Sequence, residues 1–223
     1  MKKYFLLYVI LVALVCGIGM NGKNCFWDKG ILAISSIEEM NKMKCLMEAG
    51  STKDSINYFK GYTEEMMERY GEAENIAIVI PTGNVKVYST GVVQEVTVQK
   101  MIKGGVEKET IWLEKLGGSF HVNDSDKVLS YAEVVNIMQS ENRYLCFFDS
   151  IPLNERTGIF QYHLYESDYF SAINLDATND RDIINAKQVY SFGELKNIEF
   201  FCTDYEELQY MNKIKSAIIE KYL

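Results

Sequence analysis

Two histidines are the first candidates for chemistry in this chain, because imidazole is the usual general base near neutral pH. His121 precedes a polar stretch, residues 122–127, in which histidine and aspartate could together bind a metal. Neither histidine has the spacing to a third ligand that a metal motif requires. We therefore expect a solvated turn after His121, and a structural or surface role for His163, which falls in a predicted strand.

The acidic run from Asp176 to Asp182 is partly similar to a calcium-binding loop. An EF-hand loop needs glycine at its sixth position and glutamate at its twelfth. Arg181 and Lys187 occupy these positions, so the EF-hand match fails. The sequence leaves two interpretations, an acidic surface loop as the default and a weak, irregular calcium site as the alternative.

Catalytic signatures are missing from the sequence. It contains no G-x-S-x-G elbow, no H-E-x-x-H zinc motif, no P-loop and no G-x-G-x-x-G nucleotide motif. Carboxylates are plentiful, but a linear sequence does not show which two face each other at the distance a glycosidase needs. The sequence therefore assigns no catalytic residue, no cofactor and no metal site. It leaves enzymatic activity open and favours a non-catalytic protein.

Four cysteines follow the N-terminal apolar run, in which a fifth, Cys16, is found. An even number in an exported protein allows three pairings of Cys25, Cys45, Cys146 and Cys202. Their wide spacing also fits buried thiols, which behave as small hydrophobic groups. Cys146 lies in an apolar run that would raise rather than lower its pKa, so it is not a candidate nucleophile.

The N-terminus predicts export from the cytoplasm. Lys2 and Lys3 precede an uncharged apolar run from Tyr4 to Met20, the pattern of an export signal. Three fates are open: a cleaved signal, a retained membrane anchor, and a lipoprotein modified at Cys16. We expect residues 1–22 to be this signal or anchor and the rest to work outside the cytoplasm, secreted or anchored.

The amino-acid composition limits the classes of molecule that this protein could bind. The 223 residues carry a net charge of −8, which argues against nucleic acid, because phosphate binding needs concentrated Lys and Arg. The same charge disfavours docking on anionic lipid beyond residues 4–20. Fifteen tyrosines and eleven phenylalanines supply bulky side chains for a core and for strand faces.

Helical patterns are predicted at both ends of the exported part. From Ser36, which with Glu39 resembles a capping box, a helix is expected to run toward Gly50, and a second from about 54 to Tyr70. A further capping box, at Thr203 and Glu206, precedes an amphipathic helix with apolar residues every three or four positions. That stripe is expected to pack on a sheet or close a barrel end, with a partner-binding helix as the alternative.

Between the helices the hydrophobic period becomes that of β-strands. The first strand is expected to stop at Pro81, Thr82 and Gly83. The apolar run at 144–148 is expected to be central in the sheet, since it is apolar on both faces. The expected strands are 76–80, 92–102, 109–114, 144–148 and 159–166, and their spacing suggests a small barrel or sandwich.

The run from Glu95 to Gly118, with residues 142–148 downstream, resembles the β-rich extracellular domains of Gram-positive cell-envelope proteins of unknown role. This resemblance covers about residues 76–200 and implies an OB-type or netrin-like five-stranded barrel. The chain departs from the pattern at Phe148, where an aliphatic residue is usual, and before Arg143, where a glycine is usual. A netrin-like protease inhibitor would need a free N-terminal cysteine at Cys25, for which no small-residue cleavage site precedes it.

The sequence as a whole predicts an α+β protein: a small OB-like antiparallel β-barrel with N-terminal helices and a C-terminal amphipathic helix. The expected divisions are 1–22, a helical segment 23–73, and a barrel-like domain 74–223. The predicted function is an exported, non-catalytic binding or interaction domain of the cell envelope, for an unidentified protein or ligand. Two alternatives stay open: a scaffold subunit of a membrane-associated complex, and a secreted hydrolase using paired carboxylates.

Overall fold

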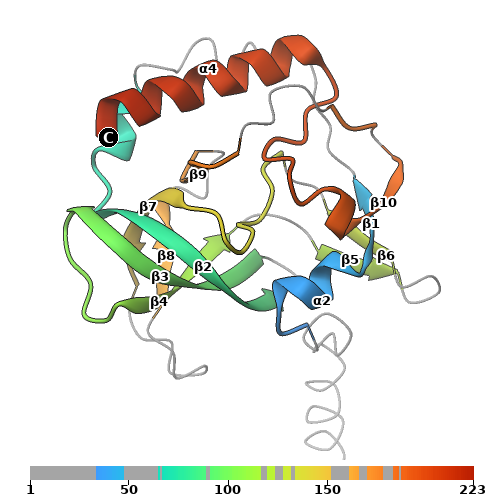
Figure 1. Cartoon of the computed structure of the whole chain (residues 1–223), viewed down its shortest axis with the longest axis horizontal. Helices are drawn as coiled ribbons and strands as arrows, with labels where there is room; N and C mark the ends of the chain where they lie inside the picture. Colours follow the sequence, from blue (N-terminus) through green and yellow to red (C-terminus); the bar gives the residue numbers. More distant parts are fainter. Residues whose placement is uncertain are drawn as a thin grey trace, which may run out of the picture.

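A closed five-stranded barrel, a second small sheet and a long C-terminal helix make up the described part of this α+β protein (Figure 1). The structure is a computed structural model, and it describes residues 34–47, 65, 67–88, 91–116, 120–123, 128–131, 134–151, 161–165, 170–177, 183–185 and 187–223. Within these ranges, no helix combines the length and the apolar content that crossing a bilayer would need. Residues 1–22, predicted to be a signal or anchor, and Cys25 lie outside the described residues, so the predictions made for them and for Cys16 stay predictions.

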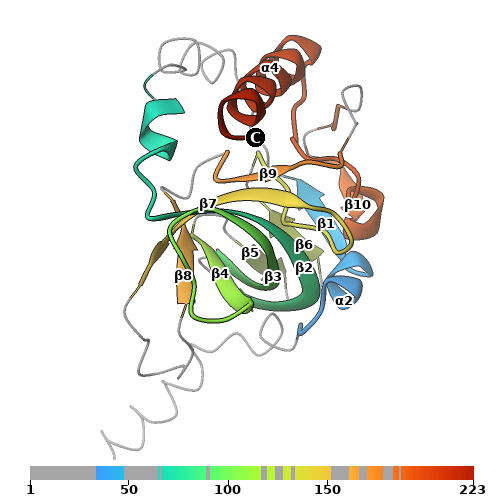
Figure 2. The same cartoon turned by 60° about the vertical axis from the view of Figure 1, so that its left-hand side comes forward.

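The barrel is formed by strands that curve round until the last pairs with the first (Figure 2). Its strands, in spatial order, are β2 (Asn75–Tyr88), β3 (Gly91–Lys103), β4 (Thr110–Leu116), β8 (Gln161–Leu164) and β7 (Tyr144–Ser150), and β7 closes on β2. The five expected strands are thus confirmed as barrel strands. The antiparallel prediction is wrong at one place: β4 and β8 run parallel, so the barrel is mixed. The long connection from β4 to β8 permits this, because parallel neighbours need a crossover rather than a hairpin.

Strand β2 does not stop at Pro81 as expected. It continues to Tyr88, and its register against β3 shifts between Pro81 and Val85. Proline lacks the N–H that a regular ladder needs, and a bulge is one of the few places where a sheet accepts it. β7 is central, as predicted: it pairs with β2 on one edge and with β8 and β9 (Ala172–Asn174) on the other.

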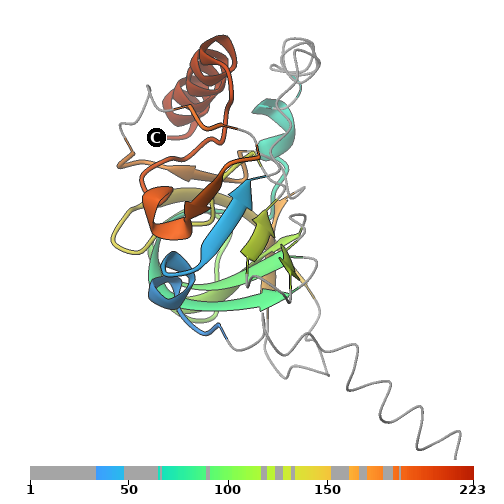
Figure 3. The same ribbon diagram turned by 90° about the vertical axis from the view of Figure 1, so that its right-hand side faces the viewer.

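The second sheet is formed by segments far apart in the chain, and Figure 3 shows it beside the barrel. Its spatial order is β10 (Val189–Ser191), β1 (Lys44–Met47), β6 (Val128–Tyr131) and β5 (Phe120–Asn123). The helix expected from Ser36 toward Gly50 is therefore wrong after its first turns, since α2 spans only Ile37–Asn41. Residues 44–47 alternate between exposed and buried, the period of a strand, and pair with β6 and β10. The second expected helix lies mostly outside the described residues, which show helix at 67–70.

Helix caps agree in part with the sequence prediction. Ser36 caps α2 by accepting from the N–H of Glu39, and the Glu39 carboxylate accepts from the N–H and the hydroxyl of Ser35. The C-terminal helix α4 (Tyr205–Tyr222) is capped by Asp204 and not by Thr203, because the Asp204 carboxylate accepts from the N–H groups of the first turn. A complete capping box opens the short 3-10 helix η2 (Phe192–Glu194).

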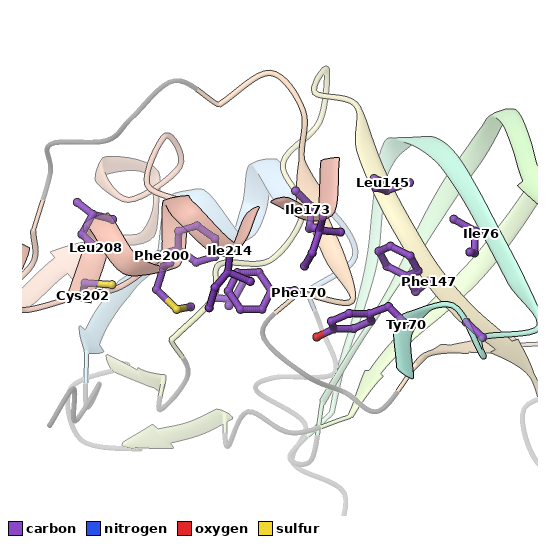
Figure 4. Packing of buried hydrophobic residues seen from close by; sticks show 14 residues of the cluster. Tyr70, Ile76, Leu145, Phe147, Phe170, Ile173, Phe200, Cys202, Leu208 and Ile214 are labelled. Atoms are coloured by element: carbon purple, nitrogen blue, oxygen red, sulfur yellow. The ribbon is translucent and has the colours of Figure 1, made fainter. Parts of the chain in front are cut away.

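Buried side chains of the described residues form three hydrophobic clusters. Cluster one joins α2, β1 and the far end of β2 to η2. Cluster two lies between α4 and the outer side of β2 and β7 (Figure 4), and it buries the apolar stripe of α4: Leu208, Met211, Ile214 and Ile218. Cluster three fills the inside of the barrel. The α4 stripe therefore packs on the barrel, as predicted, and is not a free partner-binding face.

Residues 134–139 run between these clusters, and we call them the central segment. Val135 belongs to cluster two, Ile137 to cluster one and Met138 to cluster three. Consecutive side chains thus enter different cores, which neither a helix nor a strand period would produce.

Candidate functional site

The two histidines lie on the strands of different sheets. His163 is on β8, with its Nε2 4.0 Å from Asp149 Oδ2, and its side chain is one-third exposed. His121 is within β5, which continues to Asn123, and its side chain is outside the described set. The residues between β5 and β6, where the solvated turn is expected, also lie outside it. Among the described residues, no three histidine, cysteine or carboxylate side chains gather where a metal ion could bind.

Asp176, the first residue of the acidic run, is part of an ion pair. Its carboxylate accepts from the backbone N–H and the guanidinium of Arg143, the shorter guanidinium bond being 2.6 Å. These hydrogen bonds lower the pKa of Asp176 below its ordinary value. The carboxylate fixes the start of β7, a structural role, while residues 178–182 lie outside the described chain and leave the calcium alternative as a prediction.

The cysteines that the structure describes are free thiols. Cys45, Cys146 and Cys202 are buried, each in a different hydrophobic cluster. Burial raises the pKa of Cys45 to about 12 and raises those of the other two as well. A thiol held protonated is a poor nucleophile, so the described cysteines act as apolar packing groups.

The central segment is the polar feature that sequence reasoning missed. A buried loop must find partners for its backbone groups, and here side chains supply them. Gln94, on the inner side of β3, donates to the carbonyl of Met138 (2.7 Å) and accepts from its N–H (2.9 Å). Tyr144 accepts from the N–H of Gln139, and the ammonium of Lys115 donates to the carbonyl of Val135.

A buried ion pair joins α4 to the stretch between η2 and α4. Lys215 Nζ lies 2.5 Å from the Glu199 carboxylate, which also accepts from the backbone N–H of Asn174. Both charged side chains are almost fully covered, at 11% and 7% exposed. Burial raises the pKa of Glu199 above its ordinary value, and the charge of Lys215 opposes that rise. The pair is a connection between elements and not an open acid–base site.

Small hollows lie beside the central segment among the described residues. Two of them each hold about 10 Å³, roughly one water molecule. Aromatic and aliphatic side chains of cluster three occupy the rest of the barrel. Neither of these two hollows admits a ligand larger than water.

The outer side of β2, β3 and β4 carries a fixed set of aromatic and polar groups, which we call the Trp112 face: Thr82, Asn84, Lys86, Glu95 and Trp112. Trp112 points outward because its neighbours Ile111 and Leu113 point into the barrel. Lys86 reaches across β3 and places its ammonium 4.4 Å from the centre of the Trp112 ring.

A carboxylate is held beside this ring. Glu95 is the register partner of Trp112 on the neighbouring strand. Its Oε2 accepts from the Thr82 hydroxyl at 2.8 Å and from the Asn84 amide at 2.7 Å. Thr82 and Asn84 are exposed, and the other three side chains are half-buried. Residues 111–113 are all apolar, so the sequence does not show that Trp112 faces outward, and its pairing with Lys86 and Glu95 depends on the sheet.

No family model, curated protein or solved structure matches the chain in the comparisons made.

Proposed function

We propose that this chain is an exported, non-catalytic binding domain of the cell envelope, and that it holds an oligosaccharide on the Trp112 face. The observation that carries the proposal is the set of groups on that face. An aromatic ring offers an apolar platform for a sugar ring, and a fixed carboxylate, amide and hydroxyl offer hydrogen bonds to sugar hydroxyls. These groups stand on paired strands, which position a site more firmly than loops do.

The barrel topology supports the same proposal. The structure has a closed, mixed five-stranded barrel, and the sequence predicts that it is OB-like. In OB-type barrels the face of the second and third strands binds oligonucleotides or oligosaccharides. The net charge of −8 disfavours the oligonucleotide, since polyanions need basic surfaces. Export through residues 4–20, the expectation from the sequence, would place the face among envelope polysaccharides. The scaffold alternative loses one of its contacts, because the α4 stripe is buried in cluster two.

Ligand binding can be tested through the intrinsic fluorescence of Trp112. The sequence has only two tryptophans, so Trp27→Phe leaves Trp112 as the reporter. We expect a saturable change on titration with a soluble N-acetylglucosamine or glucan oligomer, and none with a single-stranded oligonucleotide. By calorimetry, Trp112→Ala and Glu95→Ala should each weaken binding about tenfold or more, the loss of about 1.4 kcal/mol or more.

The matched control is Tyr205→Ala, which removes an aromatic ring that is 53% exposed on α4. It should bind as the unaltered protein does. Equal affinity of Trp112→Ala and the unaltered protein would refute the location of the site. No saturable signal with any glycan would refute the ligand class.

Export is tested separately by the intact mass of the chain recovered from its native envelope. A mass without about the first 20 residues indicates a cleaved signal, and a full-length mass indicates a retained anchor. A diacylglycerol adduct on Cys16 indicates a lipoprotein. Recovery of the full-length chain from the cytoplasm alone would contradict the proposal.

A further inference from the structure

The Trp112 face already holds one cation, which the protein itself supplies. Lys86 places its ammonium 4.4 Å from the centre of the Trp112 ring, close enough for the electron-rich ring to attract the positive charge. Among the described residues, this ammonium forms no hydrogen bond and no ion pair with a carboxylate. A cation–π contact without further bonds is weak at a half-buried site, so a ligand can displace Lys86 from the ring at little cost.

Two carboxylates flank the same ring. Glu95 is the register partner of Trp112, and Glu114 lies two positions further along β4 on the same side of the sheet. Glu95 Oε2 accepts from Thr82 and Asn84, whereas its Oε1 has no hydrogen-bond donor among the described residues. Glu114 is half-buried and has neither a hydrogen bond nor an ion pair with any of them. The ring therefore stands beside two acceptors that a ligand can use.

The charges around the ring favour a positively charged ligand over a neutral one. Two carboxylates stand there against one ammonium, and the whole chain has a net charge of −8. His163, the register partner of Glu114 on β8, lies 4.0 Å from Asp149, so a carboxylate of its own already faces it. A ligand ammonium that donates to Glu95 makes a charge-assisted hydrogen bond, which is stronger than the bond from a neutral hydroxyl.

We propose that the Trp112 face selects amino-sugar oligomers whose amine is free rather than acetylated. This inference rests on the proposed function and names the class of sugar. The apolar side of one sugar ring stacks on Trp112 in place of Lys86, and the ammonium of that sugar donates to Glu95 Oε1. Lys86 is then an internal competitor, which occupies the ring until the ligand displaces it. Acetylation of the amine removes the charge that Glu95 recognises.

The test compares two ligands of equal length by calorimetry, the trimer of glucosamine and the trimer of N-acetylglucosamine, in a mildly acidic buffer that keeps the free amine protonated. The unaltered full chain should bind the glucosamine trimer about tenfold more tightly, or better. Glu95→Gln keeps the size of the side chain but removes its charge, so it should bring the two affinities together. A preference that persists in Glu95→Gln overturns the inference.

The unaltered chain decides the matter even where a variant fails to fold. Equal affinities for the two trimers, or tighter binding of the acetylated one, overturn the inference and leave the proposed function standing. Absence of binding by both trimers overturns the two together. Trilysine blocked at both ends carries as many amines as the glucosamine trimer but no sugar ring, and it should bind more weakly. Equal affinity for trilysine overturns the sugar class.

Lys86→Gln tests the competition for the ring. Loss of the contact with Trp112 should raise the affinity for the glucosamine trimer about two- to fivefold. The control is Lys100→Gln, the same change at an exposed position further along β3, and it should leave the affinity unchanged. A lowered affinity in Lys86→Gln would mean that this lysine binds the ligand, and it would overturn the competition.

Proton NMR follows the same displacement without a variant. The ε-methylene protons of Lys86 adjoin the ammonium above the Trp112 ring, so the ring current should shift their resonances upfield in the free protein. This shift should disappear during titration with the glucosamine trimer. An upfield shift that remains at saturation overturns the displacement of Lys86 by the sugar.

Discussion

Replacing Gln94 by leucine tests whether a side chain holds the central segment in place. Gln94 is 3% exposed and makes two hydrogen bonds to the peptide groups of Met138. Leucine has a similar volume but neither donor nor acceptor, so one backbone N–H and one carbonyl lose their partners. Each buried orphan costs about 1–3 kcal/mol, and the apolar gain of leucine offsets part of this. We expect the free energy of unfolding to fall by about 2–5 kcal/mol.

The measurement is urea unfolding of the full chain, with hydrogen exchange at the Met138 amide as a local probe. The control is Gln99→Leu, which makes the same chemical change at an exposed position of the same strand. It should alter stability by no more than about 0.5 kcal/mol. The reasoning fails if the two variants are equally stable, or if the Met138 amide is as protected in Gln94→Leu as in the unaltered protein.

Three further predictions concern positions away from Gln94. Gly104→Ala should lower the free energy of unfolding, measured by thermal denaturation, by about 1–3 kcal/mol, because φ of Gly104 is +76° and the new Cβ would lie 2.4 Å from two oxygen atoms. Gly105→Ala is the control and should leave stability unchanged, because a Cβ there meets no atom within 4 Å. Lys215→Met should lower the free energy of unfolding by about 3–5 kcal/mol, because it leaves the buried Glu199 carboxylate without its partner. Adding Glu199→Gln should recover part of this loss, and additive effects of the two changes would contradict the reasoning. The pKa of Asp176 is lowered from 3.8, so its ion pair stabilises the fold above that value and is lost as pH falls through the lower folded value. Asp176→Asn should lack the fall in stability just below pH 3.8, and identical pH profiles would refute the assignment.

The barrel strands could be predicted from the sequence because their inner residues alternate with outer ones. β7 could be recognised as central, since its first five residues, 144–148, are apolar on both faces of the strand, and all five are buried. β1 could not, because four residues with a methionine and a cysteine fit a helical spacing equally well. Its strand character comes from β6 and β10, which lie about 80 and 140 residues further along the chain.

The polar features were harder to foresee. Trp112 stands between two other apolar residues, so the sequence does not show which side it faces, and its contact with Lys86 crosses an intervening strand. The central segment has no period to detect, because Val135, Ile137 and Met138 face three different clusters. The parallel pairing of β4 and β8 also carries no local signal, since it depends on how the chain returns after β7.

The central segment has a consequence for how the molecule folds and unfolds. Because six residues supply a side chain to each of the three clusters, no cluster is complete until the other two have closed round the same segment. The second sheet and α4 therefore cannot unfold, or be removed, while the barrel stays folded. The described body should unfold in one cooperative transition, and a cut within residues 134–139 should dismantle all three clusters together.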